Sequence, residues 1–326
     1  MSIQDGFKGQ IGFAVGTGRC GTKFISQAIG FEPDVSSVHE RNVLNESFHR
    51  YCKWYDLPVD DEGFLQAKEM EIREDLKGRR FSFEASAQLS FSIRELYGCF
   101  GAKFILLARS PELVVNSFVR KGLYDRPFIS SDCGLAPGYQ RCQAFHHFLG
   151  RIGPHGEKLL QWNQMSQVGR IAWYWNAVNE RVLDQFHSIP DTHWKIETIE
   201  GLSYDRYLEI AQFLGFQGTI AEEAYENLVQ SRPNALIDVP TITKWTAREV
   251  AEFEAEVEPM AKRLGYEYRV RNLPVPHQGS LSSNSQDNSE KVSCLEKRSY
   301  RGSRLSSYGC PRAPNWWEKI LFRFRS

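Results

Sequence analysis

The chain has 326 residues, and its 40 basic and 40 acidic side chains cancel to a formal net charge of zero. A balanced charge argues against a nucleic-acid-binding protein, and no run approaches the ~18 apolar residues that a membrane span needs. The length allows one large α/β domain, alone or with appendages.

The seven cysteines are an odd number and show no metal-type pairs. We therefore expect reduced thiols, no metal site and a cytoplasmic protein. The first eight residues have no apolar signal region, which agrees with that expectation.

The first predicted unit is a strand, a glycine loop and a helix. Ile11–Val15 is a short apolar run typical of a buried strand. The loop Gly16–Gly21 follows, and Phe24, Ile25 and Ala28 have helical spacing after it. This unit turns backbone N–H groups and a helix N-terminus toward an anion.

The residues of this loop predict a phosphate or sulfate as its ligand. The candidate binding residues are Gly18, Arg19, Cys20, Gly21, Thr22, Lys23 and Phe24. The residues match two known phosphate-binding loops in part. The spacing matches the dinucleotide pattern G-x-G-x-x-G, with Glu40 near the place of its ribose carboxylate. The triphosphate P-loop needs Lys followed by Ser or Thr, and here Thr22 precedes Lys23.

The chain then alternates strands and helices. Residues 34–40 are predicted as a strand that ends in His39 and Glu40, and residues 42–78 as mostly helical, with a charged stretch from Glu62 to Lys77. Further strands are predicted at 80–84 and 193–197. Helices are predicted at 92–100, 168–186, 204–214 and 246–264.

The run Lys103–Ala108 is typical of a central parallel strand buried on both faces. After it, Ser110 and Pro111 suit the N-cap and first position of a helix that reaches about Lys121. The whole pattern predicts a three-layer α/β/α fold with a mainly parallel central sheet.

Ligands of such sheets bind beyond the carboxyl ends of the strands. Arg109 stands at such an end, where triphosphatases carry a magnesium-binding Asp, so we expect a bare anion there. Ser117 lies two helical turns further on. The glycine loop and the Arg109…Ser117 pair therefore predict a nucleotide with phosphates at both ends of its ribose.

These two motifs together resemble those of the sulfotransferases that use 3′-phosphoadenosine-5′-phosphosulfate (PAPS). Gly16–Phe24 is similar to the 5′-phosphosulfate loop, and Phe104–Ser117 to the 3′-phosphate motif. The resemblance covers about residues 9–268 and is to bacterial and Golgi-type members rather than to cytosolic animal enzymes. It implies the P-loop-like sulfotransferase fold, with PAPS as the donor and 3′,5′-adenosine bisphosphate as the product.

The resemblance also implies roles. Glu40 is the expected general base and His39 the alternative, since neighbouring residues of a strand point in opposite directions. Arg19 would contact the bridging oxygen. Phe24 would stack on adenine or pack in the core. The adenine-contacting Tyr of many members is Ile196 here, and the arginine-lysine-glycine segment of the cytosolic enzymes is absent before Trp245.

We therefore expect residues 1–272 to form a sulfotransferase domain that acts on a small-molecule, glycan or lipid acceptor. The insertion at 122–168 is predicted to be irregular and to bind substrate or act as a lid. The alternatives are a nicotinamide-dependent oxidoreductase and a non-catalytic nucleotide-binding scaffold.

The C-terminal part has a different composition. Residues 273–310 read as a flexible polar linker. Residues 311–326 place aromatic side chains beside basic ones on a short amphipathic segment, which suits reversible membrane contact. The alternative is that this segment docks on the catalytic domain or on a second subunit.

Overall fold

The computed structural model describes residues 6–7, 9–125, 152–231 and 244–266. The chain divides into two compact units, 1–271 and 272–326. The predicted linker and the segment 311–326 lie outside the described residues, as does most of the predicted insertion.

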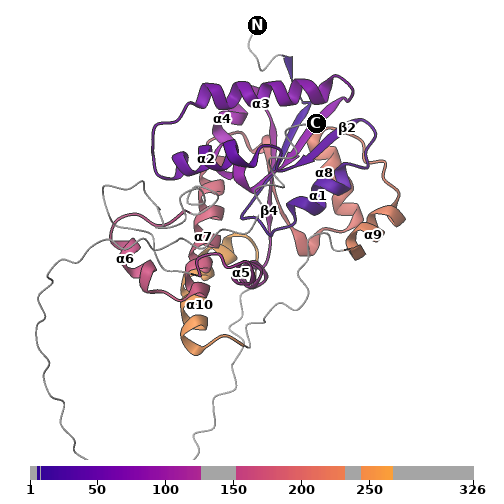
Figure 1. Ribbon diagram of the computed structural model, residues 1–326. Coiled ribbons are helices and arrows are strands. Elements are labelled where there is room, and N and C mark those ends of the chain that lie inside the picture. The colour runs from indigo at the N-terminus through magenta and orange to yellow at the C-terminus, as the bar shows by residue number, and fades with distance from the viewer. Residues whose placement is uncertain (1–5, 8, 126–151, 232–243, 267–326) are drawn as a thin grey trace, which may run out of the picture. The chain divides into compact units, whose positions relative to one another are not determined.

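A parallel five-stranded sheet forms the centre of the first unit, with the strand order β2-β3-β1-β4-β5 (Figure 1). The strands are β1 (Ile11–Val15), β2 (Val35–His39), β3 (Phe81–Ala85), β4 (Lys103–Ala108) and β5 (Trp194–Thr198). Every neighbouring pair is parallel, so the carboxyl ends of all five strands lie at one edge of the sheet.

Helices cover both faces of the sheet (Figure 1). One face carries α1 (Thr22–Ile29), α8 (Tyr204–Leu214) and α9 (Glu222–Ser231). The other carries α2 (Val43–Trp54), α3 (Asp61–Leu76), α4 (Ile93–Phe100), α5 (Pro111–Arg120), α6 (Glu157–Gln164), α7 (Gln167–Phe186) and α10 (Ala247–Arg263), together with the 3₁₀ turn η2 (Ala87–Phe91).

The central strands show why the fold has three layers. Phe13 of β1 packs in the α7 core, while its neighbour Ala14 packs in the α1 core. In β4, Phe104 and Ile105 divide in the same way. Successive residues of a strand point to opposite faces, so strands that are apolar throughout need helices on both sides. The predicted α/β/α fold is confirmed.

The observed elements differ from the predicted ones in three places. Residues 122–168 were predicted to be irregular, but they contain α6 and the first turn of α7. Trp162 of α6 is fully buried, so this part of the insertion belongs to the core. Helix α9 and the turn η2 were not predicted, because α9 buries one residue, Tyr225, and η2 has five residues, so neither shows a clear apolar period.

The helix ends follow the predicted residues only in part. Thr246 and Glu249 form a reciprocal capping box at the start of α10, and Gly265 follows its end with φ +78°. Ser110 is the N-cap residue of α5, but its side chain makes no capping hydrogen bond. Instead, the Ser110 amide donates to the carboxylate of Glu200 at 2.9 Å, so a distant residue fixes the start of this helix.

Candidate functional site

The predicted site residues gather at the carboxyl edge of the sheet. The glycine loop follows β1, Arg109 follows β4, and β1 and β4 are neighbours in the sheet. Glu40 follows β2 at the same edge. The fold therefore brings together residues as far apart in the chain as Arg19 and Ser117, which are separated by 98 positions.

The β1–α1 loop needs glycine at both ends. A Cβ on Gly16 would lie 2.6 Å from the carbonyl oxygen of Leu107 in β4, so the loop starts in contact with the neighbouring strand. Gly21 is the N-cap residue of α1 with φ +99°, and a Cβ there would meet the Ile199 side chain at 2.5 Å. A side chain at either end would displace the loop.

Side chains from three elements hold this loop by its carbonyl oxygens. Ser90 Oγ donates to Gly16 O at 2.8 Å, and Tyr174 OH donates to Thr17 O at 3.0 Å. Arg109 Nη1 donates to Arg19 O at 2.9 Å. Among the loop amides, Gly16 N donates to Ser90 Oγ at 3.2 Å, so the loop is held through both kinds of backbone group.

Arg19 links the two predicted anion-binding motifs. Its Nε donates to Ser117 Oγ of α5 at 2.8 Å, while its carbonyl accepts from Arg109. Its backbone is left-handed, with φ +57°, which aims the side chain across the loop toward α5. Burial and then the nearby charge of Arg109 lower the pKa of Arg19. The structure thus joins the loop cation and the Arg109…Ser117 pair in one cationic cluster.

Two aromatic residues hold the segment from Arg109 to the start of α5, one directly and one through Glu200. Its carbonyl accepts from Trp175 Nε1 of α7 at 3.2 Å. Tyr266, just after α10, donates to the second oxygen of Glu200 at 3.0 Å, so the α5 start and the α10 end share one carboxylate. Burial raises the pKa of the Tyr266 hydroxyl, and the charge of Glu200 raises it further. Tyr266 is a site neighbour that the sequence did not indicate.

The remaining loop residues have distinct surroundings. Cys20 is fully buried, and burial raises the pKa of its thiol. Thr22 is buried, and its hydroxyl lies 3.1 Å from His39 Nε2, while Lys23 is exposed. Phe24 packs in the core with its ring edge against Tyr225, at 5.7 Å between centroids. The adenine contact of Phe24 stays a prediction.

His39 and Glu40 serve different faces of the sheet, as the alternation along β2 predicts. Ser37 and His39 contact α1 through Ser26 and Thr22, whereas Ser36 donates to Asp75 of α3. Burial and then the charge of Lys23 lower the pKa of His39. Glu40 follows the strand in a left-handed conformation, with φ +50°.

Glu40 is a half-buried carboxylate among cations. Burial raises the pKa of Glu40, and the like charge of Glu46 raises it further. The charges of Lys121, Arg50 and Arg19 act in the opposite direction without outweighing burial. A carboxyl with a raised pKa is a stronger proton acceptor once it is ionised. The Glu40 carboxyl therefore binds a proton more tightly than an exposed glutamate does.

Two of these cations were missed by the sequence analysis. Lys121 follows Ser117 by four residues, a spacing that puts both on one side of α5 and could have revealed it. Arg50 of α2 is buried, donates to Tyr174 OH at 2.9 Å and stacks over the Phe91 ring. Nothing in the sequence near Arg50 signals this contact, which spans 124 positions.

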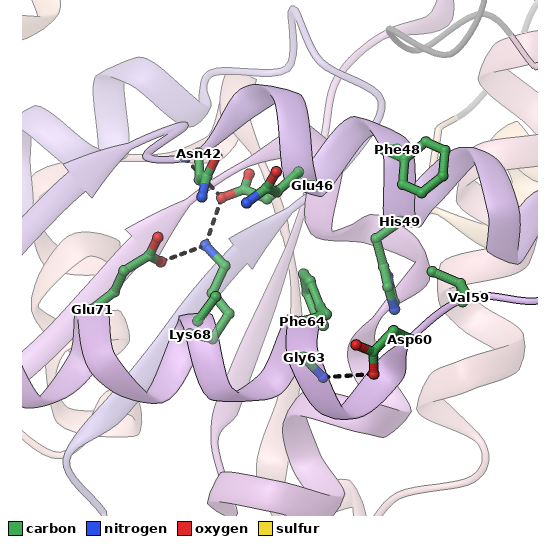
Figure 2. A pocket seen from close by; sticks show the side chains of 12 residues that line it. Asn42, Glu46, Phe48, His49, Val59, Asp60, Gly63, Phe64, Lys68 and Glu71 are labelled. Atoms are coloured by element: carbon green, nitrogen blue, oxygen red, sulfur yellow. Dashed lines mark hydrogen bonds and ion pairs between the residues drawn. The ribbon is translucent and has the colours of Figure 1, made fainter. Parts of the chain in front are cut away.

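A separate hollow of about 210 Å³ lies between α2 and α3 (Figure 2). Its lining combines charged and aromatic side chains, among them Glu46, His49, Phe64, Lys68 and Glu71. None of the predicted site residues lines it.

The predictions about metal sites, membrane spans and thiols concern the whole chain, and the structure addresses them for the described residues. Within the described residues, no group of His, Cys, Asp or Glu side chains has a geometry that could hold a metal ion. No helix in the same residues is long and apolar enough to cross a membrane. Cys20, Cys52 and Cys99 are free thiols.

The site thus combines an all-parallel α/β sheet with a glycine loop and two arginines at its carboxyl edge. No protein-family profile and no curated protein matches the chain. Among solved structures, the sulfotransferase STF9 from Mycobacterium avium matches with a TM-score of 0.50 and 13% identity, over 79% of this chain and 77% of that one. The chain therefore has the sulfotransferase fold, as the motifs predicted.

Two further solved structures are similar, with lower scores. The sulfotransferase domain of the Synechococcus PCC 7002 olefin synthase has a TM-score of 0.43, 13% identity, and coverage of 80% of this chain and 96% of its own. The sulfotransferase domain of the curacin biosynthetic pathway has a TM-score of 0.47, 13% identity, and coverage of 80% and 99%.

Proposed function

We propose that this protein transfers the sulfuryl group of PAPS to a hydroxyl or amine of an acceptor, with Glu40 as the general base. The observation that carries the proposal is the cationic cluster in which Arg19 contacts both Ser117 and Arg109 and lies near Glu40. Anion-binding groups and a carboxyl with a raised pKa are the two components that sulfuryl transfer needs.

In the proposed reaction an acceptor hydroxyl attacks the sulfur atom, and the bond between sulfur and the bridging oxygen breaks. Glu40 takes the hydroxyl proton, and 3′,5′-adenosine bisphosphate leaves with the bridging oxygen and its negative charge. Arg19 stabilises that charge, because it is the cation of the loop itself and is partly shielded from solvent. The chemistry balances without an oxidant, a reductant or a metal ion.

The other residues bind the donor. Thr22, Lys23 and the loop from Gly18 to Gly21 hold the 5′-phosphosulfate, with helix α1 starting at the anion. Arg109 and Ser117 hold the 3′-phosphate. Lys121 lies near both Arg19 and Glu40, which suits contact with the sulfuryl oxygens.

His39 is the alternative base. It is half-buried, its pKa is lowered by burial, and it therefore stays neutral near pH 7. Its contact with Thr22 places it beside the start of α1. We favour Glu40, because Arg19 and Lys121 are among the charges that act on it, whereas the charges that act on His39 are those of Lys23 and Glu46.

A thermal-shift comparison of 3′,5′-adenosine bisphosphate, NAD and ATP tests the class. We expect stabilisation by 3′,5′-adenosine bisphosphate alone. Stabilisation by NAD alone would favour the oxidoreductase alternative, in which Glu40 binds a ribose. Transfer of radioactive sulfate from labelled PAPS to a panel of hydroxyl and amine acceptors then separates an enzyme from a nucleotide-binding scaffold.

We further propose a cytoplasmic protein that contacts membranes reversibly through residues 311–326. From Lys291 to the end the chain carries nine basic and two acidic residues, although it is neutral as a whole. Removal of 311–326 is expected to abolish sedimentation with anionic vesicles and to leave transfer to a small acceptor intact. Loss of thermal stability, with no vesicle binding by the full chain, would favour the docked alternative.

A further inference from the structure

The turn that carries Glu40 is held by three successive backbone N–H groups. Glu40 N donates to Ala85 O at 3.1 Å. Arg41 N donates to Glu84 Oε1 at 3.0 Å, and Asn42 N donates to Glu46 Oε1 at 3.1 Å. Two of the three acceptors are therefore carboxylates, one from β3 and one from α2.

One buried lysine holds both carboxylates. Lys68 Nζ of α3 lies 2.5 Å from Glu46 Oε1 and 2.9 Å from Glu84 Oε2. The exposed fractions are 2% for Lys68, 1% for Glu46 and 5% for Glu84. Glu71 approaches the same ammonium at 2.9 Å, and Figure 2 shows Glu46 and Glu71 converging on Lys68 between α2 and α3.

The second carboxylate oxygen of Glu46 contacts the end of β3. Glu46 Oε2 accepts from Ser86 Oγ at 2.7 Å, just after β3. The carboxylate thus connects the end of β3, the start of α2 and the buried lysine. Its like charge is also one of the causes that raise the pKa of Glu40.

The charges of this cluster do not balance. Glu46, Glu71 and Glu84 from three elements face one lysine, and Arg41 is occupied by Asp75 at 2.6 Å. Burial and the charge of Glu46 raise the pKa of Glu84, although Lys68 opposes them. Burial would raise the pKa of Glu46 as well, but Lys68 outweighs it and the pKa is lowered. The Glu46 carboxyl is therefore held ionised, whereas the pKa of Glu84 is raised to about 7.

Part of this arrangement is an ordinary helix cap, because Glu46 accepts from the amide of Asn42, the N-cap residue of α2. The capping box of α10 makes the same kind of contact, from Glu249 to Thr246 N at 2.8 Å. That cap is exposed and uses no buried cation. Burying a lysine with several carboxylates is unfavourable unless well-aligned ion pairs and hydrogen bonds offset the loss of hydration. A simple helix cap therefore does not explain the cluster.

We propose that Lys68, Glu46 and Glu84 are positioning residues that hold the Glu40 carboxyl in its reactive position. This rests on the proposed function, in which Glu40 takes the acceptor proton. The cluster holds the backbone amides that follow Glu40. It therefore stabilises the left-handed conformation of Glu40, which is unfavourable for a residue other than glycine.

The decisive variant is Glu46→Gln, which keeps the shape of the side chain and removes its charge. Without the like charge, the pKa of Glu40 falls, so the acid limb of the kcat/KM profile moves to lower pH. Misplacement of the turn lowers kcat, by up to about a hundredfold. The KM for PAPS and the affinity for 3′,5′-adenosine bisphosphate are expected to stay within about twofold of wild type.

Glu84→Gln tests the positioning alone. It keeps an acceptor for Arg41 N but turns an amide toward Lys68, so kcat should fall. The acid limb should move less than in Glu46→Gln, because Glu46 and not Glu84 is among the charges with the largest effect on the pKa of Glu40. The matched control is Glu32→Gln. Glu32 is also a buried carboxylate that accepts from backbone amides, at Thr219 N and Ile220 N, but it lies before β2 at the opposite edge of the sheet.

The control is expected to lose stability with no change in kcat or in the pH profile. An unmoved acid limb and an unchanged kcat in Glu46→Gln would overturn the proposal, as would equal kcat losses in Glu46→Gln and Glu32→Gln. Carboxyl NMR titration of Glu40 gives a readout without turnover. If the wild-type chain transfers no sulfate, the proposed function fails, while a lower Glu40 pKa in Glu46→Gln would still support the cluster, and an unchanged one would reject it.

Discussion

Two turns at the carboxyl edge of the sheet, one after β1 and one after β2, each place a charged residue in a left-handed conformation. Arg19 has φ +57° and Glu40 has φ +50°. The first turn is held by its carbonyl oxygens, at Gly16, Thr17 and Arg19, and by the Gly16 amide, which donates to Ser90 Oγ. The second is held by its amides, from Glu40 to Asn42.

The difference agrees with the roles that we propose for the two turns. A loop that binds an anion needs its amides for the ligand, so hydroxyl, phenol and guanidinium donors fix its carbonyls. A turn that presents a carboxylate has no such need, and carboxylates can fix its amides. A left-handed non-glycine residue costs about 1–3 kcal/mol, so both turns need such support.

The largest expected effect comes from Glu40→Gln, which removes the reactive group from the second turn and leaves its backbone contacts in place. Turnover should fall by ~10²–10⁴, since that is the usual contribution of a positioned general base. Affinity for 3′,5′-adenosine bisphosphate should not change. Steady-state kinetics and calorimetry check both. Full turnover in Glu40→Gln, with a collapse in His39→Ala, would assign the base to the other residue.

The next effect is on stability. Lys68→Met leaves Glu46 and Glu84 buried without their cation, which should lower the free energy of unfolding by about 3–5 kcal/mol. Urea denaturation measures it. The control is Lys77→Met, which breaks the ion pair with Glu74 on the surface, where both side chains are about 70% exposed, and should change stability by less than about 1 kcal/mol. Equal effects would mean that the buried cluster is no more important than a surface pair.

Arg109→Ala acts on the first turn. It removes the contact to Arg19 O and the proposed contact to the 3′-phosphate, which together should weaken nucleotide binding by about 1.5–3 kcal/mol, or roughly ten- to a hundredfold. Calorimetry with 3′,5′-adenosine bisphosphate measures the loss. The control variant is Arg206→Ala, at a side chain that is 40% exposed and forms an ion pair with Glu197. Wild-type affinity in Arg109→Ala would remove the 3′-phosphate role.

The smallest effect tests the support of the first turn by a single hydroxyl. Tyr174→Phe removes the donor to Thr17 O and the acceptor of Arg50, and should cost about 1 kcal/mol of stability. Because the loop is then held less firmly, nucleotide affinity should fall by a few-fold as well. Tyr204→Phe, which loses a hydroxyl contact to Ile220 O on the other face, should reduce stability without changing affinity.

The pH dependence of stability gives a further check on the second turn. The pKa of Glu84 is raised to about 7 in the folded chain, from 4.5 without the fold. The folded state therefore binds the proton more tightly, and this contribution to stability is complete below pH 4.5 and is lost as the pH rises toward 7. In Glu84→Gln, denaturation midpoints between these pH values should depend less on pH than in wild type.

The parallel sheet and the glycine loop could be predicted from the sequence, and the spacing of Arg109 and Ser117 singled out that pair as a further candidate. These features are local, because an apolar run, a glycine spacing or a pair on one helix is complete within about ten residues. Their meeting at one edge follows from parallel strands, which a sequence pattern can predict.

Only the tertiary structure decided what holds Glu40. Lys68 lies in the charged stretch from Glu62 to Lys77, where a lysine reads as a solvated helix residue, yet it is 2% exposed. Its partners Glu46 and Glu84 are 22 and 16 positions away. Arg50 and Tyr174 are 124 positions apart. Contacts of this range depend on how helices pack over strands, and no local pattern of charge or hydrophobicity records that packing.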